Sequence, residues 1–138
     1  MPLIIYKCEN LEENKWIVIY NKEFNNESDI NNEYRGGTPG YIHNNIIYGL
    51  GHKTIINDKV IHIPFIWKLN IDNYNLVIQN ITSDHFINNI IDPTSILKID
   101  NNYFMISAES MEPWFQDQNY ITKIYNITNE LKKYIFHS

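Results

Sequence analysis

The chain has 138 residues and a mass of 16.5 kDa, which is the size of one domain. Its residues are 43% hydrophobic and 20% charged, so it holds enough apolar material for a packed core and is not typical of a disordered protein. The net charge is −5 and the 11 Lys and Arg residues are spread singly, which argues against nucleic acid as a partner.

The composition also indicates the cellular compartment and the kind of genome that encodes the protein. The apolar runs are too short for a membrane span, and the N-terminus lacks the basic flank and small-residue cleavage site of a signal peptide, so we expect a cytoplasmic protein with no membrane contact. The single cysteine, Cys8, excludes a disulfide framework and a zinc site with several thiolates. The 21 Asn and 26 Ile residues have A/T-rich codons, which is typical of an A/T-rich viral or protist genome and predicts a viral protein of the host cytoplasm.

Strand-forming residues dominate the pattern along the chain, and a polar, Asn-rich loop is expected over 23–33. Turn residues at Asn44-Asn45 and at 100–102 predict two hairpins. A Thr or Asn cap before 130–135 predicts a short terminal helix. The runs expected to form strands are 16–20, 41–48, 53–56, 60–67, 74–81, 90–99, 103–107 and 120–125.

Short strands at spacings near ten residues, with almost no helical periodicity, predict an all-β fold. We expect a single β-rich domain over 1–138, built as an antiparallel meander with a short C-terminal helix. The pattern alone leaves a sandwich, a barrel and a propeller open as the arrangement of its strands.

The segment 34–40 has the least ordinary composition of the chain, because two adjacent glycines and a Pro-Gly pair stand in a Gly-poor sequence. We expect backbone with unusual dihedral angles here. One interpretation is a strand-entry turn with a solvated arginine. The other is a binding loop in which Gly36 and Gly37 let the backbone approach a ligand, while Arg35 offers a planar fork to carboxylate, phosphate or vicinal hydroxyl groups.

Three histidines lie within twenty residues of one another. His52 stands among small residues that would leave its ring reachable. His43 and His62 lie nearby but lack the tight spacing of metal ligands, so we expect neither a metal site nor a cofactor. The alternating pattern of its strand predicts that His62 is a hydrogen-bonded residue at the edge of the core.

Acidic and aromatic residues in the second half of the chain are candidates for a sugar site. Asp92 precedes a proline at the head of a strand, where it forms either a local turn or a carboxylate that points into a pocket. Glu109 and Trp114 follow a later strand, in a mixture of acids and rings that sugar sites often use. Alternatively, Trp114 and Phe115 fill one end of the core.

Four segments taken in order, 34–39, 48–52, 92–97 and 102–108, resemble the glycosidase-like five-bladed β-propellers, hydrolases and phosphorylases that act on furanosides and mannosides. The resemblance covers residues 12 to 127. It implies an axial pocket with one carboxylate, Asp92, and a second chosen from Glu109, Glu112 and Asp117, of which Glu109 is preferred. The residues that it places around this pocket are Arg35, Thr38, His52, Asp92 and Glu109.

The chain supplies only two to three blades of such a ring, since each four-stranded blade takes about 40 to 50 residues. The chain is then a fragment of a longer propeller, one of two copies that complete a ring, or a meander rebuilt into a smaller sandwich. We expect a partial propeller whose bare edge strands pair in a homodimer.

These observations predict a carbohydrate-active or carbohydrate-binding domain that takes a carbohydrate or a sugar phosphate. Arg35 and His52 would hold sugar hydroxyl groups, and Trp114 would stack on the sugar ring. If the domain is an enzyme, it is a glycoside hydrolase with paired carboxylates. The alternative is a non-catalytic viral domain that binds a host or viral protein. A nucleotide binder or nuclease is disfavoured by the acidic charge balance.

Overall fold

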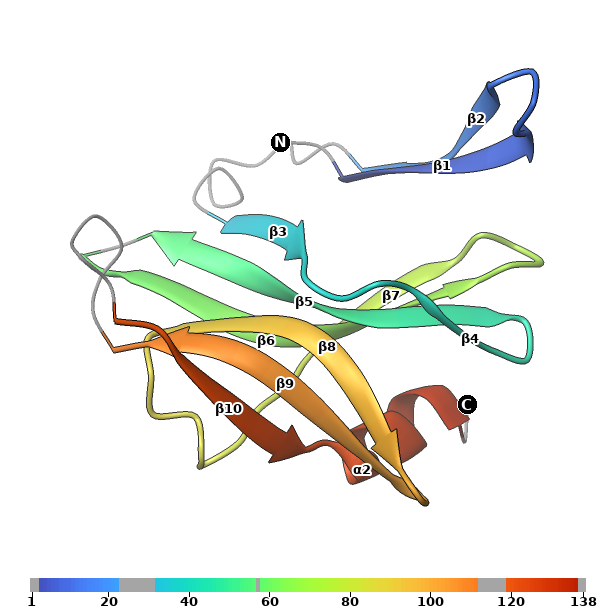
Figure 1. Cartoon of the computed structure of the whole chain (residues 1–138). Helices are drawn as coiled ribbons and strands as arrows, with labels where there is room; N and C mark the ends of the chain where they lie inside the picture. The colour runs from blue at the N-terminus through green and yellow to red at the C-terminus, as the bar shows by residue number, and fades with distance from the viewer. Residues whose placement is uncertain (1–2, 23–31, 57, 112–118, 137–138) are drawn as a thin grey trace.

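The chain forms three antiparallel sheets followed by a short helix in the computed structural model (Figure 1). The structure describes residues 3–22, 32–56, 58–111 and 119–136. This architecture confirms the predicted all-β antiparallel meander with a C-terminal helix. The strands are β1 Leu3–Asn10, β2 Lys15–Lys22, β3 Asn32–Gly36, β4 Tyr41–His43, β5 Ile46–Ile56, β6 Val60–Asn70, β7 Leu76–Asn80, β8 Ile90–Ile99, β9 Asn102–Ser110 and β10 Ile121–Asn126.

Strands that follow one another in the chain pair with one another in each sheet. β1 and β2 form a hairpin of their own, and the five-stranded sheet has the order β3-β5-β6-β7 with β4 also pairing β5. The three-stranded sheet has the order β10-β9-β8. No helix in the described part of the chain has the length and apolar character needed to cross a bilayer.

Two predicted hairpin turns are confirmed by their backbone angles. Asn44 has φ 51° between β4 and β5, and Asp100 has φ 52° between β8 and β9. Both values lie in the left-handed region, which Asn and Asp tolerate better than other non-glycine residues. The sequence therefore determined these turns locally.

The long β5–β6 hairpin is the centre of the molecule. Its inward face carries Leu50 and Ile66, which are opposite each other and almost fully buried. On its other face two aromatic residues of β6 pair with glycines of β5, Phe65 with Gly51 and Trp67 with Gly49. A Cβ on Gly49 would lie 2.7 Å from Trp67 Cζ2, so these glycines leave the space that the rings fill.

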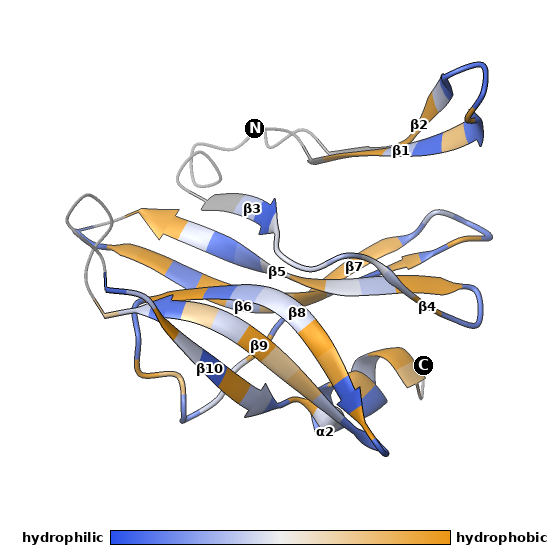
Figure 2. Ribbon diagram, in the orientation of Figure 1, coloured by the Kyte–Doolittle hydropathy of each residue, from blue (hydrophilic) through white to orange (hydrophobic). Residues whose placement is uncertain are grey.

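The hydrophobic core lies between the five-stranded and the three-stranded sheets, with β8 across β5 and β6 (Figure 1). Figure 2 shows hydrophobic residues along β5, β6, β8 and β9, while the turns are hydrophilic. Burial of these apolar side chains is the main force that holds the two sheets together. The buried core residues are Tyr48, Leu50, Ile66, Ile81, Ile91, Met105, Ile127, Leu131 and Ile135.

The C-terminal helix closes one end of this core. It consists of α2, Thr128–Leu131, and a π-helical turn η1, Lys132–Phe136, which bury Leu131 and Ile135. The N-cap of α2 is Ile127, which makes no side-chain cap hydrogen bond, so the predicted Thr or Asn cap was wrong, although the Thr128 amide donates to the Asn126 side chain at 3.0 Å.

Two elements were not predicted. β1 was not recognised as a strand, and residues 34–36 belong to β3 although a turn was expected there. A strand that pairs with a distant partner depends on that partner, and β3 pairs with β5 about twenty residues later in the chain. Most of the polar loop predicted over 23–33 lies outside the described residues.

Candidate functional site

The double-glycine segment is a strand end that packs on β5. Arg35 stands opposite His52 and Gly36 stands opposite Gly51 in the β3–β5 pair. The Thr38 hydroxyl accepts a hydrogen bond from the Leu50 amide at 2.9 Å, and the Thr38 amide donates to the Leu50 carbonyl at 3.1 Å. The predicted substrate-binding residues of this segment are therefore fixed against the middle of β5.

The glycines of this segment serve close approach and not unusual dihedral angles. All five glycines of the chain are described, and none has a positive φ, so that expectation was wrong. A Cβ on Gly37 would lie 2.3 Å from the Pro93 carbonyl oxygen. A Cβ on Gly36 would meet no atom within 4 Å. Gly37 thus lets the β3 end touch the start of β8, next to Asp92.

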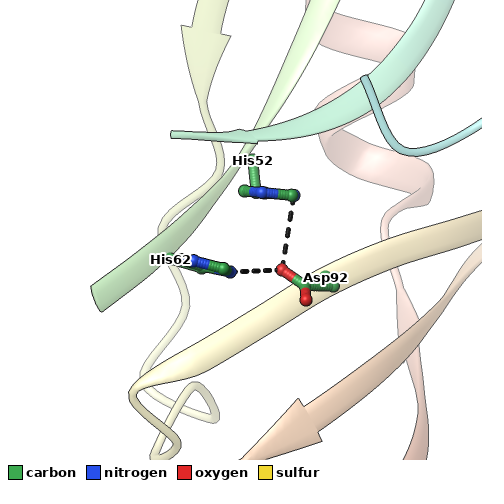
Figure 3. A group of neighbouring side chains, drawn as sticks. All are labelled: His52, His62 and Asp92. Carbon is green, nitrogen blue, oxygen red and sulfur yellow. Dashed lines mark hydrogen bonds and ion pairs between the residues drawn. The ribbon is translucent and has the colours of Figure 1, made fainter. Parts of the chain in front are cut away.

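Three chemically active side chains meet where β8 crosses the β5–β6 hairpin (Figure 3). His62 Nδ1 and Asp92 Oδ1 are hydrogen-bonded at 2.5 Å, and His52 Nδ1 lies 3.3 Å from the same carboxylate oxygen. The two imidazole rings are stacked, with centroids 4.4 Å apart and an interplanar angle of 10°. We call His52, His62 and Asp92 the His-Asp cluster.

The hairpin register explains why both histidines reach one carboxylate. His62 stands opposite Thr54, which lies two residues after His52 on β5. Residues two apart on a strand share a face, so the two rings lie on the same side of the sheet as neighbours on a diagonal. The position of His62 beside His52 depends on the turn between β5 and β6, which the sequence pattern did not specify. The predicted site therefore contained His52 and Asp92 but not His62.

Burial governs the electrostatics of the cluster. His52 is 8% exposed, and burial lowers the pKa of its imidazole below the usual 6.5. The carboxylate of Asp92 acts in the opposite direction with a smaller effect, while His62 and Arg35 lower the pKa of His52 further. Asp92 also affects Tyr120, which lies just before β10. Partial burial and then the charge of Asp92 raise the pKa of the Tyr120 hydroxyl.

Glu109, the second predicted catalytic carboxylate, lies in a separate environment. In the β8–β9 pair Glu109 stands opposite Ile91, whereas Asp92 stands opposite Ala108. Since side chains alternate along a strand, Asp92 and Glu109 leave the sheet on opposite faces. Glu109 is fully buried and accepts hydrogen bonds from Asn88 at 2.5 Å and from Ser107 at 2.7 Å. The structure therefore does not bring the two predicted carboxylates together.

Glu109 is surrounded by polar groups but has no contact with solvent. Lys123 Nζ lies 3.8 Å from a Glu109 oxygen, and the pKa of the Tyr125 hydroxyl is raised by burial and then by Glu109. These contacts are those of a buried, compensated charge. The alternative carboxylates Glu112 and Asp117, and the predicted stacking residue Trp114, lie outside the described residues.

A cavity of about 280 Å³ lies on the face of the five-stranded sheet that points away from the core. Ile5 of the β1–β2 hairpin contributes to its wall, and Lys7 of the same hairpin donates to the Tyr74 hydroxyl at 3.3 Å. The wall also contains three predicted binding residues and three aromatic residues of β3 and β6. These are Arg35, Gly36, Thr38, Tyr34, Phe65 and Trp67.

Sequence reasoning missed the role of Trp67 in this cavity. The alternation of residues along β6 puts Phe65 and Trp67 on one face, but that alternation alone does not mark the face as a binding surface. The available signal was the alternation of glycines at 49 and 51 with the rings opposite them.

No family model matches the chain, and neither does any curated protein or solved structure compared with it. The function of this protein is therefore inferred from the geometry of its sites.

Proposed function

We propose that the protein binds a carbohydrate in the cavity beside Trp67. The observation that carries this proposal is that Arg35, Gly36 and Thr38 line the same cavity as the Trp67 ring. Sugar sites combine an aromatic ring that packs on the apolar face of a pyranose with a few polar groups at the edge.

The position of Trp67 supports a stacking role. One part of its indole ring lies against the backbone of Gly49, where a side chain would clash with it. The residue is only partly buried and is one of the residues that line the cavity. A ring held in this way presents a rigid flat surface, which costs little conformational entropy when a ligand binds.

The size of the cavity supports a small ligand. A volume of about 280 Å³ lies just below the usual range of about 300 to 1,000 Å³ for ligand sites, so we expect one or two sugar rings.

The proposal concerns binding and not hydrolysis. A glycoside hydrolase needs two carboxyl groups on either side of the scissile bond, about 5 to 9.5 Å apart. Asp92 and Glu109 do not line this cavity, and their side chains leave the three-stranded sheet on opposite faces. A hydrolytic role for this pair therefore has no support in their placement.

The test is a titration of the purified chain with a panel of monosaccharides, disaccharides and sugar phosphates, followed by calorimetry. We expect Trp67→Ala to weaken binding about tenfold or more, because the stacking contact is lost. Trp16→Ala is the matched control, since Trp16 is half exposed on β2, does not line the cavity and should leave the affinity unchanged.

Two results would overturn the proposal. One is sugar binding that Trp67→Ala leaves unchanged, which would place the ligand elsewhere. The other is a cavity that takes an apolar probe such as a fatty acid but no sugar. A chain that binds no sugar at all would favour the alternative function, a non-catalytic domain that binds another protein.

A further inference from the structure

The His-Asp cluster has the composition of a transition-metal site. Two imidazoles and one carboxylate are a common ligand set for zinc and other divalent first-row metals. The three side chains each offer one ligand atom, and these atoms all lie within 4.8 Å of one another. They come from β5, β6 and β8, so rigid strands and not a loop hold them in place.

The polar atoms of buried His52 point to a missing partner. His52 is 8% exposed, yet neither of its ring nitrogens makes a hydrogen bond within the described structure. Its Nδ1 lies 3.3 Å from Asp92 Oδ1 but is not aligned to donate to it. The hydroxyl of Thr54, opposite His62, is also buried without a partner. Unsatisfied buried polar atoms are costly, and a bound ion would remove that cost at His52 Nδ1.

The distances fit one ion between the three side chains. Two ligand atoms at 2.0 to 2.1 Å from a tetrahedral zinc ion lie about 3.4 Å apart. His52 Nδ1 and Asp92 Oδ1 are 3.3 Å apart, so their separation already matches. The hydrogen-bonded pair of His62 and Asp92 is closer, at 2.5 Å, and must open by about 0.9 Å. His62 would then carry its proton on Nε2.

We propose that His52 Nδ1, His62 Nδ1 and Asp92 Oδ1 bind one Zn²⁺ ion. The stacked rings bring both Nδ1 atoms within 3.3 Å of the same carboxylate oxygen, and the His52 ring must turn so that its Nδ1 faces an ion held there (Figure 3). Three protein ligands leave one coordination position open, and the Asp92 side chain is 28% exposed, so water can reach the ion. This site lies on the core side of the five-stranded sheet, whereas the sugar cavity lies on its other side, so it is independent of the proposed carbohydrate binding.

The test uses the full chain after treatment with a chelator, titrated with Zn²⁺ by calorimetry and with Co²⁺ by visible absorption. We expect one equivalent of Zn²⁺ per chain and the intense d–d bands of tetrahedral Co²⁺. His62→Gln and Asp92→Asn should each weaken Zn²⁺ binding by about a hundredfold, because a ligand is lost. His85→Gln is the matched control, since His85 is exposed and outside the cluster.

A thermal melt of each variant shows whether it folds, and Zn²⁺ should raise the melting temperature of the wild type and of His85→Gln only. The Co²⁺ spectrum of the wild type tests the site even if both cluster variants fail to fold. Weak binding that is equal in the wild type and all folded variants would overturn the proposal, as would a preference for Mg²⁺ or Ca²⁺ or a Co²⁺ spectrum without d–d bands of tetrahedral intensity. Zinc binding should survive Trp67→Ala, and sugar binding should survive His62→Gln, so the two proposals fail separately.

Discussion

Glu109 shows how the surroundings of one residue change its interpretation. Its sequence context predicted a catalytic acid, but the side chain is fully buried and receives hydrogen bonds from Asn88 and Ser107. Lys123 lies 3.8 Å away and compensates its charge. A carboxylate with these partners links the segment before β8 to β9 and β10, and removing its charge leaves the partners without an acceptor of equal strength.

We expect Glu109→Gln to lower the free energy of unfolding by about 1 to 3 kcal/mol, because a charged acceptor is replaced by a neutral amide that also brings donors into a closed site. Urea unfolding measures the change. Glu12→Gln is the control, since Glu12 is exposed, and its stability should match the wild type. Unchanged stability of Glu109→Gln, together with loss of a glycosidase activity, would return Glu109 to a catalytic role.

The sequence predicted the environment of His62 in the His-Asp cluster but not its partner. The alternation of residues along its strand predicted that His62 is hydrogen-bonded at the edge of the core, and its bond to Asp92 confirms this. The same pattern cannot say which carboxylate the ring meets, because Asp92 lies thirty positions later in the chain.

At the scale of elements, the contact between the β3 end and β8 depends on one glycine. The Pro93 carbonyl oxygen occupies the position that a side chain on Gly37 would need. Pro93 is buried and directly follows Asp92, so this contact also limits how far the backbone next to Asp92 lies from the β3 end.

We expect Gly37→Ala to destabilise the fold by about 1 to 3 kcal/mol, because the added methyl group forces β3 and β8 apart against packed backbone. Gly36→Ala should stay within about 0.5 kcal/mol of the wild type, since nothing lies within 4 Å of a Cβ at that position. Thermal or urea unfolding compares the two variants. Equal effects of both substitutions would show that the approach of Pro93 does not matter.

At the scale of the whole molecule, the core between the two large sheets includes a tyrosine whose charge it does not tolerate. Tyr48 is 6% exposed, and burial raises the pKa of its hydroxyl above the usual 10.0, with further contributions from Tyr103 and Tyr41. In the unfolded chain Tyr48 ionises near pH 10, while in the folded chain it stays neutral to higher pH.

The folded protein should therefore lose stability above about pH 10, because the unfolded state releases the Tyr48 proton first. The contribution is intact below pH 10 and decreases as the pH rises toward the pKa of the folded state. Urea unfolding between pH 8 and pH 11 measures this. Tyr48→Phe should show a smaller decrease, and Tyr6→Phe, which changes an exposed tyrosine, should behave as the wild type. An identical alkaline decrease in Tyr48→Phe would contradict the assignment.

The expected homodimer stays a prediction at this scale. The three-stranded sheet ends in β10 on one edge, where Ile121 and Ile124 expose apolar side chains. The resemblance to the glycosidase-like propellers also stays a prediction. The five-stranded and three-stranded sheets each consist of strands close in sequence, as blades do, but so do the sheets of other meanders.

The sequence by itself determined the local features of this protein. Alternating apolar residues specified most strands, Asn44 and Asp100 specified hairpin turns, and the end of the chain specified a short helix, because each of these depends on a few neighbouring residues. Only the tertiary structure decided the sites. The crossing of β8 over β5 and β6 joined Asp92 to two histidines, and strand pairing separated Asp92 from Glu109 and set the Trp67 ring against Gly49. Such contacts depend on how distant strands pair and pack, which local pattern does not encode.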